Sequence, residues 1–354
     1  MMEQSRKGIR WLDWLVYAAL RIVICVIQAL SLQSCQALAR GIAWLAVDLL
    51  KIRDKVLEEN LRQALPDLDL TERKRLKREM WEHLVLMVCE IAHAPRRVHE
   101  TNWHRYITVR DRRLVVSRLL EDRPLVMVSG HFGNFEMAGF VAGLLGFSTF
   151  AIARELDNPY VHRFIDEFRR IKGQYMINKD GSAQEIKSHL DAKRTITLLG
   201  DQHAGPKGCW VDFFGRPASS HKAVAVFTLT ADAPMVVCYV RRTGKPMQLE
   251  VGVQGEVDPR TMSPDLKGIP QLTKWYNERV EEIVRRTPGQ YWWLHKRWKG
   301  EPPQRKKKKS APTNREQENP PMPGAASPSD QVTEPQRSNS VAPSGSPPST
   351  NKAA

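Results

Sequence analysis

The feature that most limits the fold is a long apolar stretch near the N-terminus, from Ile9 to Leu32. Its length matches the roughly 20 residues that a helix needs to cross a bilayer. Arg21 lies in its middle and would cost about 3 kcal/mol there unless its side chain reaches the interface. Five residues share one helical stripe, as in a helix that lies flat at the interface: Arg10, Trp14, Tyr17, Arg21 and Gln28. We therefore expect residues 1–50 to form a membrane anchor, either spanning or interfacial.

Two other interpretations of this stretch are less favoured. A cleaved signal peptide would place its cleavage site at Ala37-Leu38-Ala39. Arg21 inside the apolar run, and Arg40 just after that site, weigh against cleavage. An ordinary buried helix is the remaining alternative, but a helix this long and aromatic at the start of a soluble domain is the weaker explanation.

Residues 301–354 have the opposite character. They hold nearly half of the chain's 23 prolines, many serines and few aliphatic residues, and they begin with the basic run Arg305–Lys309. Such a segment cannot bury enough apolar area to offset the entropy of ordering it. We expect a disordered tail, in which the lysine run is more simply a solvated linker than a nuclear signal or a membrane patch.

The net charge is +15, and most of the excess lies in residues 1–300. A basic balance of this size indicates an anionic partner, either nucleic acid or the anionic face of a membrane. The five cysteines are scattered without a CxxC pair, which excludes a disulfide scaffold and a zinc finger. No cluster with the spacing of metal ligands occurs, so we expect no metal site.

Helical spacing dominates residues 41–110, with one helix closing at Asn60–Pro66 and the next beginning near a cap at Thr71. After residue 110 the pattern alternates between short apolar runs and amphipathic stretches. The expected strands are 124–129, 148–153, 195–199, 234–240 and 248–253, and the expected helices are 137–145, 159–171 and 270–287. This alternation predicts an α/β class, a layered domain within residues 51–300.

The strongest chemical signal follows the first of these strands, in the segment Val128–Glu136. His131 lies in the turn between strand and helix, and Glu136 lies in the first turn of the helix, from which its carboxylate can reach back to the imidazole. Gly130 and Gly133 permit a tight backbone there. A histidine held by a carboxylate is a general base, and with no Ser or Cys beside it the natural task is to deprotonate a substrate hydroxyl. Alone, the pattern is common enough for simple helix capping to explain it.

The surrounding motifs resemble those of the glycerolipid acyltransferase superfamily, in the branch of bacterial lipid A late acyltransferases. Four motifs match in order over residues 10–300, the first being the HxxxxE block at His131. The others are the run Arg154–Pro159 with Phe168-Arg169-Arg170, the DxxxG block at Asp201–Gly205, and the aromatic and basic run Gln290–Lys299. The resemblance implies a glycerol-phosphate-acyltransferase-like fold, with a mixed sheet flanked by helices.

The resemblance also implies transfer of a fatty acyl chain from an acyl carrier protein thioester to a hydroxyl of a lipid A precursor. The implied partners are acyl carrier protein, a membrane lipid acceptor and the membrane surface, without nucleic acid and without a cofactor. The implied location is the inner membrane, with the catalytic domain facing the cytoplasm.

The same resemblance suggests roles for particular residues. His131 would take the hydroxyl proton while Glu136 holds the imidazole. Backbone N–H groups of Gly133 and Asn134 are candidate oxyanion donors. Arg169 would bind a phosphate or donate to the reacting centre. Two further candidates complete the set: Asp201, which would order Arg169 or position acceptor sugars, and the basic group Lys296, Arg297 and Lys299, suited to phosphates or to the acidic carrier protein.

Three other functions remain open. An acyltransferase of the same fold could use another acceptor, such as a phosphatidylinositol mannoside or a lysophospholipid. A membrane-bound hydrolase could use the same histidine to activate water, although no GxSxG elbow is present. A nucleic-acid-binding protein could use the lysine run, but it would leave the apolar N-terminus and the ordered motifs unexplained.

Overall fold

The computed structural model describes residues 2–179 and 183–303 of the 354-residue chain. The described residues belong to one compact unit, which includes the N-terminal helices. The expected disordered tail, from residue 304 onward, lies outside the described residues.

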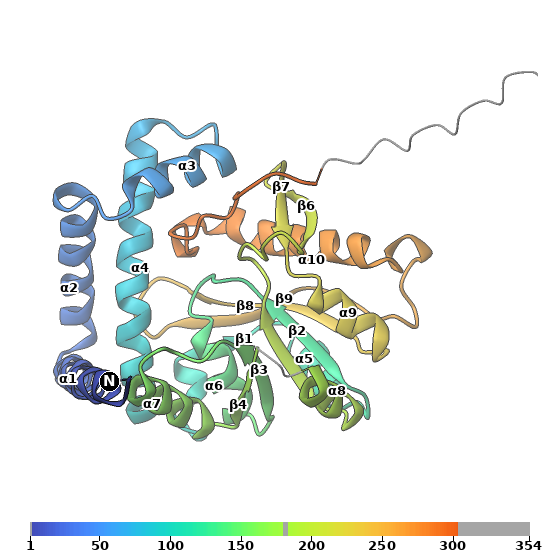
Figure 1. Ribbon diagram of the computed structural model, residues 1–354, viewed down its shortest axis with the longest axis horizontal. Helices are drawn as coiled ribbons and strands as arrows, with labels where there is room; N and C mark the ends of the chain where they lie inside the picture. The colour runs from blue at the N-terminus through green and yellow to red at the C-terminus, as the bar shows by residue number, and fades with distance from the viewer. Residues whose placement is uncertain (1, 180–182, 304–354) are drawn as a thin grey trace, which may run out of the picture. The chain divides into compact units, whose positions relative to one another are not determined.

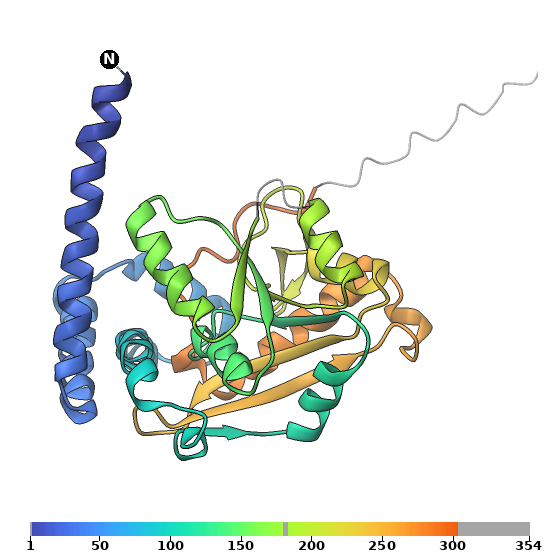
Figure 2. The same ribbon diagram turned by 90° about the horizontal axis from the view of Figure 1, so that it is seen from below.

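The N-terminal part is helical, as expected. Helix α1 spans Met2–Ala29, α2 spans Leu32–Trp44 and continues into a π-helical turn at Leu45–Leu49, α3 spans Asp54–Ala64, and α4 spans Leu70–Arg97. Helices α2 and α4 stand side by side in Figure 1, and Figure 2 shows α1 running along the edge of the unit. The cap of α4 is Asp69, which forms a capping box with Glu72, so the expected cap at Thr71 is wrong.

A seven-stranded mixed sheet forms the centre of the unit, in the order β1-β9-β8-β2-β5-β3-β4. Strands β8, β2, β5, β3 and β4 run parallel to one another, β9 pairs antiparallel to β8, and β1 pairs parallel to β9. The strands are β1 Ile107–Val109, β2 Leu125–Ser129, β3 Thr149–Ala153, β4 Gln174–Asn178, β5 Thr195–Leu199, β8 Met235–Arg242 and β9 Leu249–Val257, and a separate hairpin joins β6 Cys209–Phe213 to β7 Arg216–Ser220. The predicted α/β class with a mixed sheet is confirmed.

Helices cover both faces of this sheet. On one face α10 (Ile269–Arg286) and α9 (Ala223–Thr230) bury Tyr276, Val280 and Val224 against the sheet, together with α8 (Ala183–Asp191). On the other face α6 (Glu136–Leu144) buries Phe140 against the β8–β9 pair, with α5 (Arg112–Leu120) and α7 (Pro159–Arg170) beside it. Figure 1 shows α10 above β8 and β9 and α6 below them.

Helix α1 has two different faces. One face packs on the unit from Asp13, whose carbonyl accepts from Asn158, the N-cap of α7, to Gln28, which donates to Ala92 O on α4. The other face exposes large apolar side chains: Trp11, Leu12, Leu15, Val16, Ile22, Val23 and Val26. Within the described residues, the segment Arg10–Ala29 is long and apolar enough to cross a membrane by length and composition, and only 6% of its most apolar window is buried.

Candidate active site

The turn that carries His131 joins β2 to α6, at the carboxyl end of the parallel strands. This edge is where open α/β sheets bind their ligands. The turn depends on Gly133, whose φ is +57°. A Cβ at this position would lie 1.8 Å from Val240 O, so only glycine fits there.

Asp201 is the residue that holds His131. Strands β2 and β5 pair in parallel with Ser129 opposite Leu199, so the residues that follow the two strands meet. One Asp201 oxygen accepts from the backbone N–H of His131 at 2.9 Å, and the other lies 2.8 Å from His131 Nδ1. The carboxylate is only 2% exposed. Nδ1–H therefore donates to Asp201, and the lone pair of the ring lies on Nε2.

This geometry corrects the expected pairing of His131 with Glu136. Glu136 is the first residue of α6 and directs its carboxylate toward α7, where it binds Arg169 side-on, with Nε at 3.0 Å and Nη2 at 2.7 Å. The expectation that Asp201 orders Arg169 is also wrong, since Asp201 binds His131. The site thus contains two charge pairs, His131–Asp201 and Arg169–Glu136.

The environment of the first pair sets its protonation. Burial lowers the pKa of His131, but the charge of Asp201, its hydrogen bond and the charge of Glu136 outweigh that effect, so the pKa lies above its ordinary value of 6.5. Burial would raise the pKa of Asp201, yet the His131 charge and hydrogen bonds lower it to about 2. Asp201 is therefore ionised throughout the physiological range.

The Nε2 edge of His131 faces a polar group and two aromatic rings. Gln202 Nε2 lies 3.2 Å from His131 Nε2, an arrangement in which the amide donates to the lone pair of the ring. The rings of Phe135 and Trp292 lie edge-on, with centroids 5.1 and 5.5 Å from the imidazole. Sequence reasoning gave these three residues no role, although each lies inside a motif that it singled out.

The backbone N–H groups proposed as oxyanion donors are already occupied. Gly133 N donates to Gln290 O and Asn134 N donates to Val240 O, each at 2.8 Å. The Asn134 side chain is completely buried and donates to Glu90 Oε2 at 2.9 Å. Gly133 and Asn134 thus shape the turn, and the expectation that they bind the reacting oxygen is wrong in this geometry.

Behind the turn, a buried set of polar side chains fixes its position. Glu90 on α4 is fully buried and binds Arg242 at 2.6 and 2.9 Å. Arg242 Nη1 donates to His83 Nδ1 at 3.0 Å, so His83 is the neutral tautomer that donates from Nε2 to Gly133 O at 3.1 Å. Burial, together with the Arg242 charge, lowers the pKa of His83 to about 3. We call Glu90, Arg242, His83 and Asn134 the rear network.

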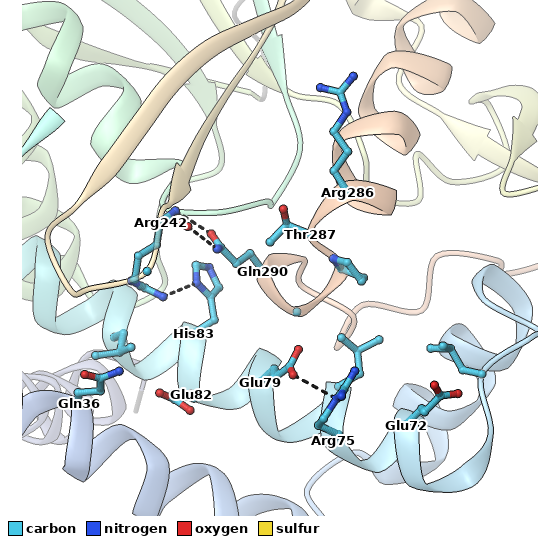
Figure 3. Close-up of a pocket in the computed structure, with 16 residues that line it drawn as sticks. Gln36, Glu72, Arg75, Glu79, Glu82, His83, Arg242, Arg286, Thr287 and Gln290 are labelled. Carbon is cyan, nitrogen blue, oxygen red and sulfur yellow. Dashed lines mark hydrogen bonds and ion pairs between the residues drawn. The ribbon is translucent and has the colours of Figure 1, made fainter. Parts of the chain in front are cut away.

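Figure 3 shows the outer side of this network, where a cavity of about 490 Å³ lies between α4 and the segment Arg286–Gln290. Gln290 exchanges two hydrogen bonds with the backbone of Arg242, at 2.9 and 2.8 Å. The lining carries both signs of charge, with Glu72, Glu79 and Arg75 among its residues. His83, Arg242 and Gln290 line this cavity but His131 does not, so the cavity is separate from the reacting edge of the imidazole.

The basic residues near the end of the domain do not form one binding surface. Arg297 is 2% exposed and donates to Ser219 O at 2.7 Å and to Ser220 Oγ at 2.6 Å. Burial lowers its pKa. Its expected role toward phosphates or a carrier protein is therefore wrong, whereas Lys296 and Lys299 are exposed.

A small apolar pocket, of about 110 Å³, lies between α6 and the sheet next to this site. Glu136, Arg169 and Phe135 are among the residues that line it, and Ala138, Gly139 and Ala142 line its α6 side. Within residues 2–179 and 183–303, no group of three or more His, Cys, Asp or Glu side chains is arranged to hold a metal ion.

Comparisons with known proteins point to one family. The sequence model described as bacterial lipid A biosynthesis acyltransferase matches residues 2–300. Lipid A biosynthesis lauroyltransferase from Escherichia coli (strain K12) is 25% identical over 300 residues, which cover 82% of this chain and 92% of that protein. Lipid A biosynthesis palmitoleoyltransferase from the same organism is 23% identical over 309 residues, 84% of this chain and 95% of that protein.

One solved structure also matches at low similarity. The crystal structure of 1-acyl-sn-glycerophosphate acyltransferase from Thermotoga maritima covers 73% of this chain and 98% of that one, at 14% identity and a TM-score of 0.35.

Proposed function

Because the chain belongs to the family of bacterial lipid A biosynthesis acyltransferases, we propose that it moves a fatty acyl chain from an acyl carrier protein thioester to a hydroxyl group of a lipid A precursor. Membership makes the chain an acyltransferase of lipid A biosynthesis. The donor, the acceptor hydroxyl and the roles of the residues are our proposal. The observation that carries it is the 2.8 Å hydrogen bond from His131 to the buried Asp201 carboxylate, which leaves Nε2 able to accept a proton.

In the proposed reaction His131 is the general base. Its Nε2 removes the proton of the acceptor hydroxyl as that oxygen attacks the thioester carbonyl carbon. The tetrahedral intermediate then expels the thiolate, which takes the proton back from the imidazolium. Asp201 holds the tautomer and stabilises the imidazolium, as the carboxylate does in a Ser-His-Asp triad. The products are an ester and a free carrier thiol, and the proposal needs no cofactor.

The negative oxygen of the intermediate needs a hydrogen-bond donor close to His131. Gln202 is our candidate because its amide nitrogen lies 3.2 Å from His131 Nε2 and carries two N–H donors, so one can serve the oxyanion while the other faces the ring. Arg169 is the nearby cation, and its side-on pair with Glu136 fixes the guanidinium plane beside the small apolar pocket. Glu136 in this proposal is a positioning residue for Arg169.

The proposed location is the inner membrane, with the catalytic domain on the cytoplasmic side. Two features of α1 support it: the exposed apolar face and the packed inner face, which joins the helix to the unit. A carrier-protein thioester is a soluble donor, whereas the acceptor is dissolved in the bilayer. An enzyme that joins them works at the membrane surface.

The test is a reconstituted reaction in detergent with acyl carrier protein thioesters and a panel of lipid acceptors, followed by mass spectrometry. We expect one added acyl chain on a lipid A precursor and its loss in His131→Ala. His104→Ala, which changes an exposed histidine, is the matched control and keeps the activity.

Two results would contradict the proposal. Release of free fatty acid without transfer would make the enzyme a hydrolase. Transfer only to a phospholipid or a mannoside would replace the acceptor.

A further inference from the structure

A second apolar cavity, larger than the pocket beside α6, has no role in the reaction described above. It lies between α1, α4 and α7 and has a volume of about 510 Å³. Leu20 and Ile24 of α1, Ile91 of α4, and Phe164 and Phe168 of α7 form its apolar lining. We call it the α1 groove.

The inner end of the α1 groove reaches the active site. Glu136 and Arg169 line both the groove and the small pocket beside α6, so their ion pair stands where the two apolar spaces meet. Glu136 is also close enough to His131 for its charge to raise the pKa of the imidazole. A chain lying in the groove therefore ends beside the catalytic base.

The wall formed by α1 connects the groove to the exposed apolar face of the same helix. Leu20, Ile24 and Cys25 face the groove, while Val23 and Val26 lie on the exposed apolar face. A lipid in the bilayer could enter from that side without passing through water. A carrier-bound acyl chain, in contrast, arrives from the aqueous side.

Two further cations line the groove beside Arg169. Arg21 contacts the Tyr17 hydroxyl at 3.0 Å and lies 5.1 Å from the Phe164 ring centroid, and Arg96 is exposed on α4. Arg169 is neutralised by Glu136, and Glu167 is the other acid in the lining. Guanidinium groups suit phosphate oxygens, so an apolar groove with this lining matches a phosphorylated lipid.

We propose that the α1 groove binds a hydrocarbon chain of the acceptor lipid, with Arg21 and Arg96 facing the acceptor's phosphate; this deepens the proposed function and rests on it. The size agrees, because small-molecule sites occupy about 300–1,000 Å³, whereas a cavity of about 150 Å³ holds only benzene. The groove therefore places the acceptor, and His131 meets its hydroxyl at the inner end.

The first test measures binding without turnover and uses Cys25, an exposed thiol on the groove side of α1. In a Cys209→Ser background, which removes the half-buried thiol, we measure maleimide alkylation of Cys25 in detergent micelles. A phosphorylated lipid A precursor slows the alkylation about tenfold or more at saturation, and acyl carrier protein thioester leaves it unchanged. The control variant carries Cys25→Ser and Val23→Cys, which moves the thiol to the exposed face, and shows no protection.

The second test fills the groove. Val88 lines it and is 46% exposed, so Val88→Trp adds volume without disturbing the core. We expect KM for the precursor to rise about tenfold, which is about 1.4 kcal/mol, while KM for the thioester stays the same. Leu120→Trp, at an exposed site on α5, is the matched control and leaves both KM values unchanged.

The outcomes separate this proposal from the one it rests on. A rise in KM for the thioester alone would make the groove a donor site and overturn the proposal. Unprotected Cys25, with normal transfer by the wild-type enzyme, would also overturn it while leaving the proposed function intact. A wild-type enzyme that fails to acylate the precursor would overturn the proposed function itself.

Discussion

At the scale of single residues, the site contains two pairs of ionisable groups, His131–Asp201 and Arg169–Glu136, and the two pairs have different roles. Asp201 lies behind the imidazole and sets its tautomer, so its charge acts on the proton that His131 takes. Glu136 lies to the side and fixes Arg169, so its charge acts on the orientation of a cation and contributes less than Asp201 to the raised pKa of His131. Variants of the two carboxylates should consequently differ in their pH dependence.

We predict that Asp201→Asn moves the pH profile as well as the rate. His131 acts as a base when neutral, so kcat/KM of the wild type rises with pH through a pKa above 6.5. Without the Asp201 charge, burial dominates and the midpoint moves to lower pH, while the plateau falls by about 10³–10⁴. Rates measured from pH 5 to 9 test this. Asp212→Asn, an exposed aspartate on β6, should change neither quantity, and an unmoved midpoint in Asp201→Asn would refute the pairing.

The second pair predicts non-additive losses. Glu136→Gln and Arg169→Gln should each lower kcat/KM by at least about tenfold, or 1.4 kcal/mol, because each leaves the other group without its side-on partner. The double variant should have about the same kcat/KM as the less active of the two single variants, since the two residues act as a unit. Arg170→Gln, the neighbouring exposed arginine, is the control. Additive losses in the double variant would show that the groups act independently.

Part of this site could be predicted from the sequence. His131 after the first strand, together with the motifs around Arg169 and Asp201, identified the residues that meet at one edge of the sheet. The partners could not be predicted, because they depend on strand order. Strand β5 lies between β2 and β3, which brings Asp201 to the imidazole, whereas chain proximity favoured Glu136.

At the scale of elements, α1 is the clearest case of one helix with two environments. Its contacts from Asp13 to Gln28 run along about 22 Å of the helix. The polar groups among these contacts, including Arg21 on Tyr17, point toward the protein. The apolar residues of α1 therefore form one exposed face, and the opposite face of the helix packs on the protein.

We predict that lysines on the outer face release the protein from membranes without unfolding it. Leu15, Ile22 and Val26 are 41–65% exposed and lie on this face. The triple change to lysine removes apolar contact with lipid while keeping the packed face, so the melting temperature in detergent should stay within a few degrees. Flotation with vesicles measures the release. Lysine at Leu70, Leu120 and Tyr175, all exposed and outside the α1 groove, is the control with equal added charge, and continued flotation of the α1 variant would place the anchor elsewhere.

The expected strands and helices after residue 110 are confirmed wherever apolar periodicity is strong, as in β2, β5, β8 and α10. Elements with mixed composition escaped prediction. Strand β4 at the sheet edge has only five residues, begins with Gln174 and ends with Asn178, and the β6–β7 hairpin contains Asp212 and Pro217. Helix α9 is almost wholly apolar and lacks the polar face that marks an amphipathic helix. In each case tertiary packing supplies what the local pattern lacks.

At the scale of the whole molecule, buried and half-buried histidines make the fold sensitive to acid. Burial, with nearby positive charges, lowers the pKa of His83 to about 3, and burial is the largest cause that lowers those of His221 and His295 to about 4. Above pH 6.5 neither the folded nor the unfolded state protonates them. Below pH 6.5 these histidines bind protons in the unfolded chain but stay neutral in the folded protein. The free energy of unfolding therefore falls as the pH drops toward 4.

We predict that His83→Gln flattens this dependence. Each fully buried neutral histidine contributes up to about 1.4 kcal/mol per pH unit between its two pKa values. The variant should therefore lose about that much slope between pH 6 and 4, even if its stability at pH 7.5 is lower. Urea unfolding at several pH values measures both quantities. His104→Gln, at an exposed histidine, should keep the wild-type slope. If His83→Gln also keeps the wild-type slope, His83 does not contribute to the acid sensitivity.

The rear network has a further consequence for how the enzyme uses binding energy. Glu90, Arg242 and His83 hold Gly133 and Asn134 through hydrogen bonds that belong to the fold itself. Immobilising a backbone residue costs about 1–2 kcal/mol of conformational entropy, and here folding itself has absorbed that cost. Substrate affinity is then undiminished by any ordering of the turn, and the reacting groups meet a preorganised surface with little reorganisation energy. Substrate specificity would then depend on the shapes of the small pocket beside α6 and of the α1 groove, which meet at Glu136 and Arg169.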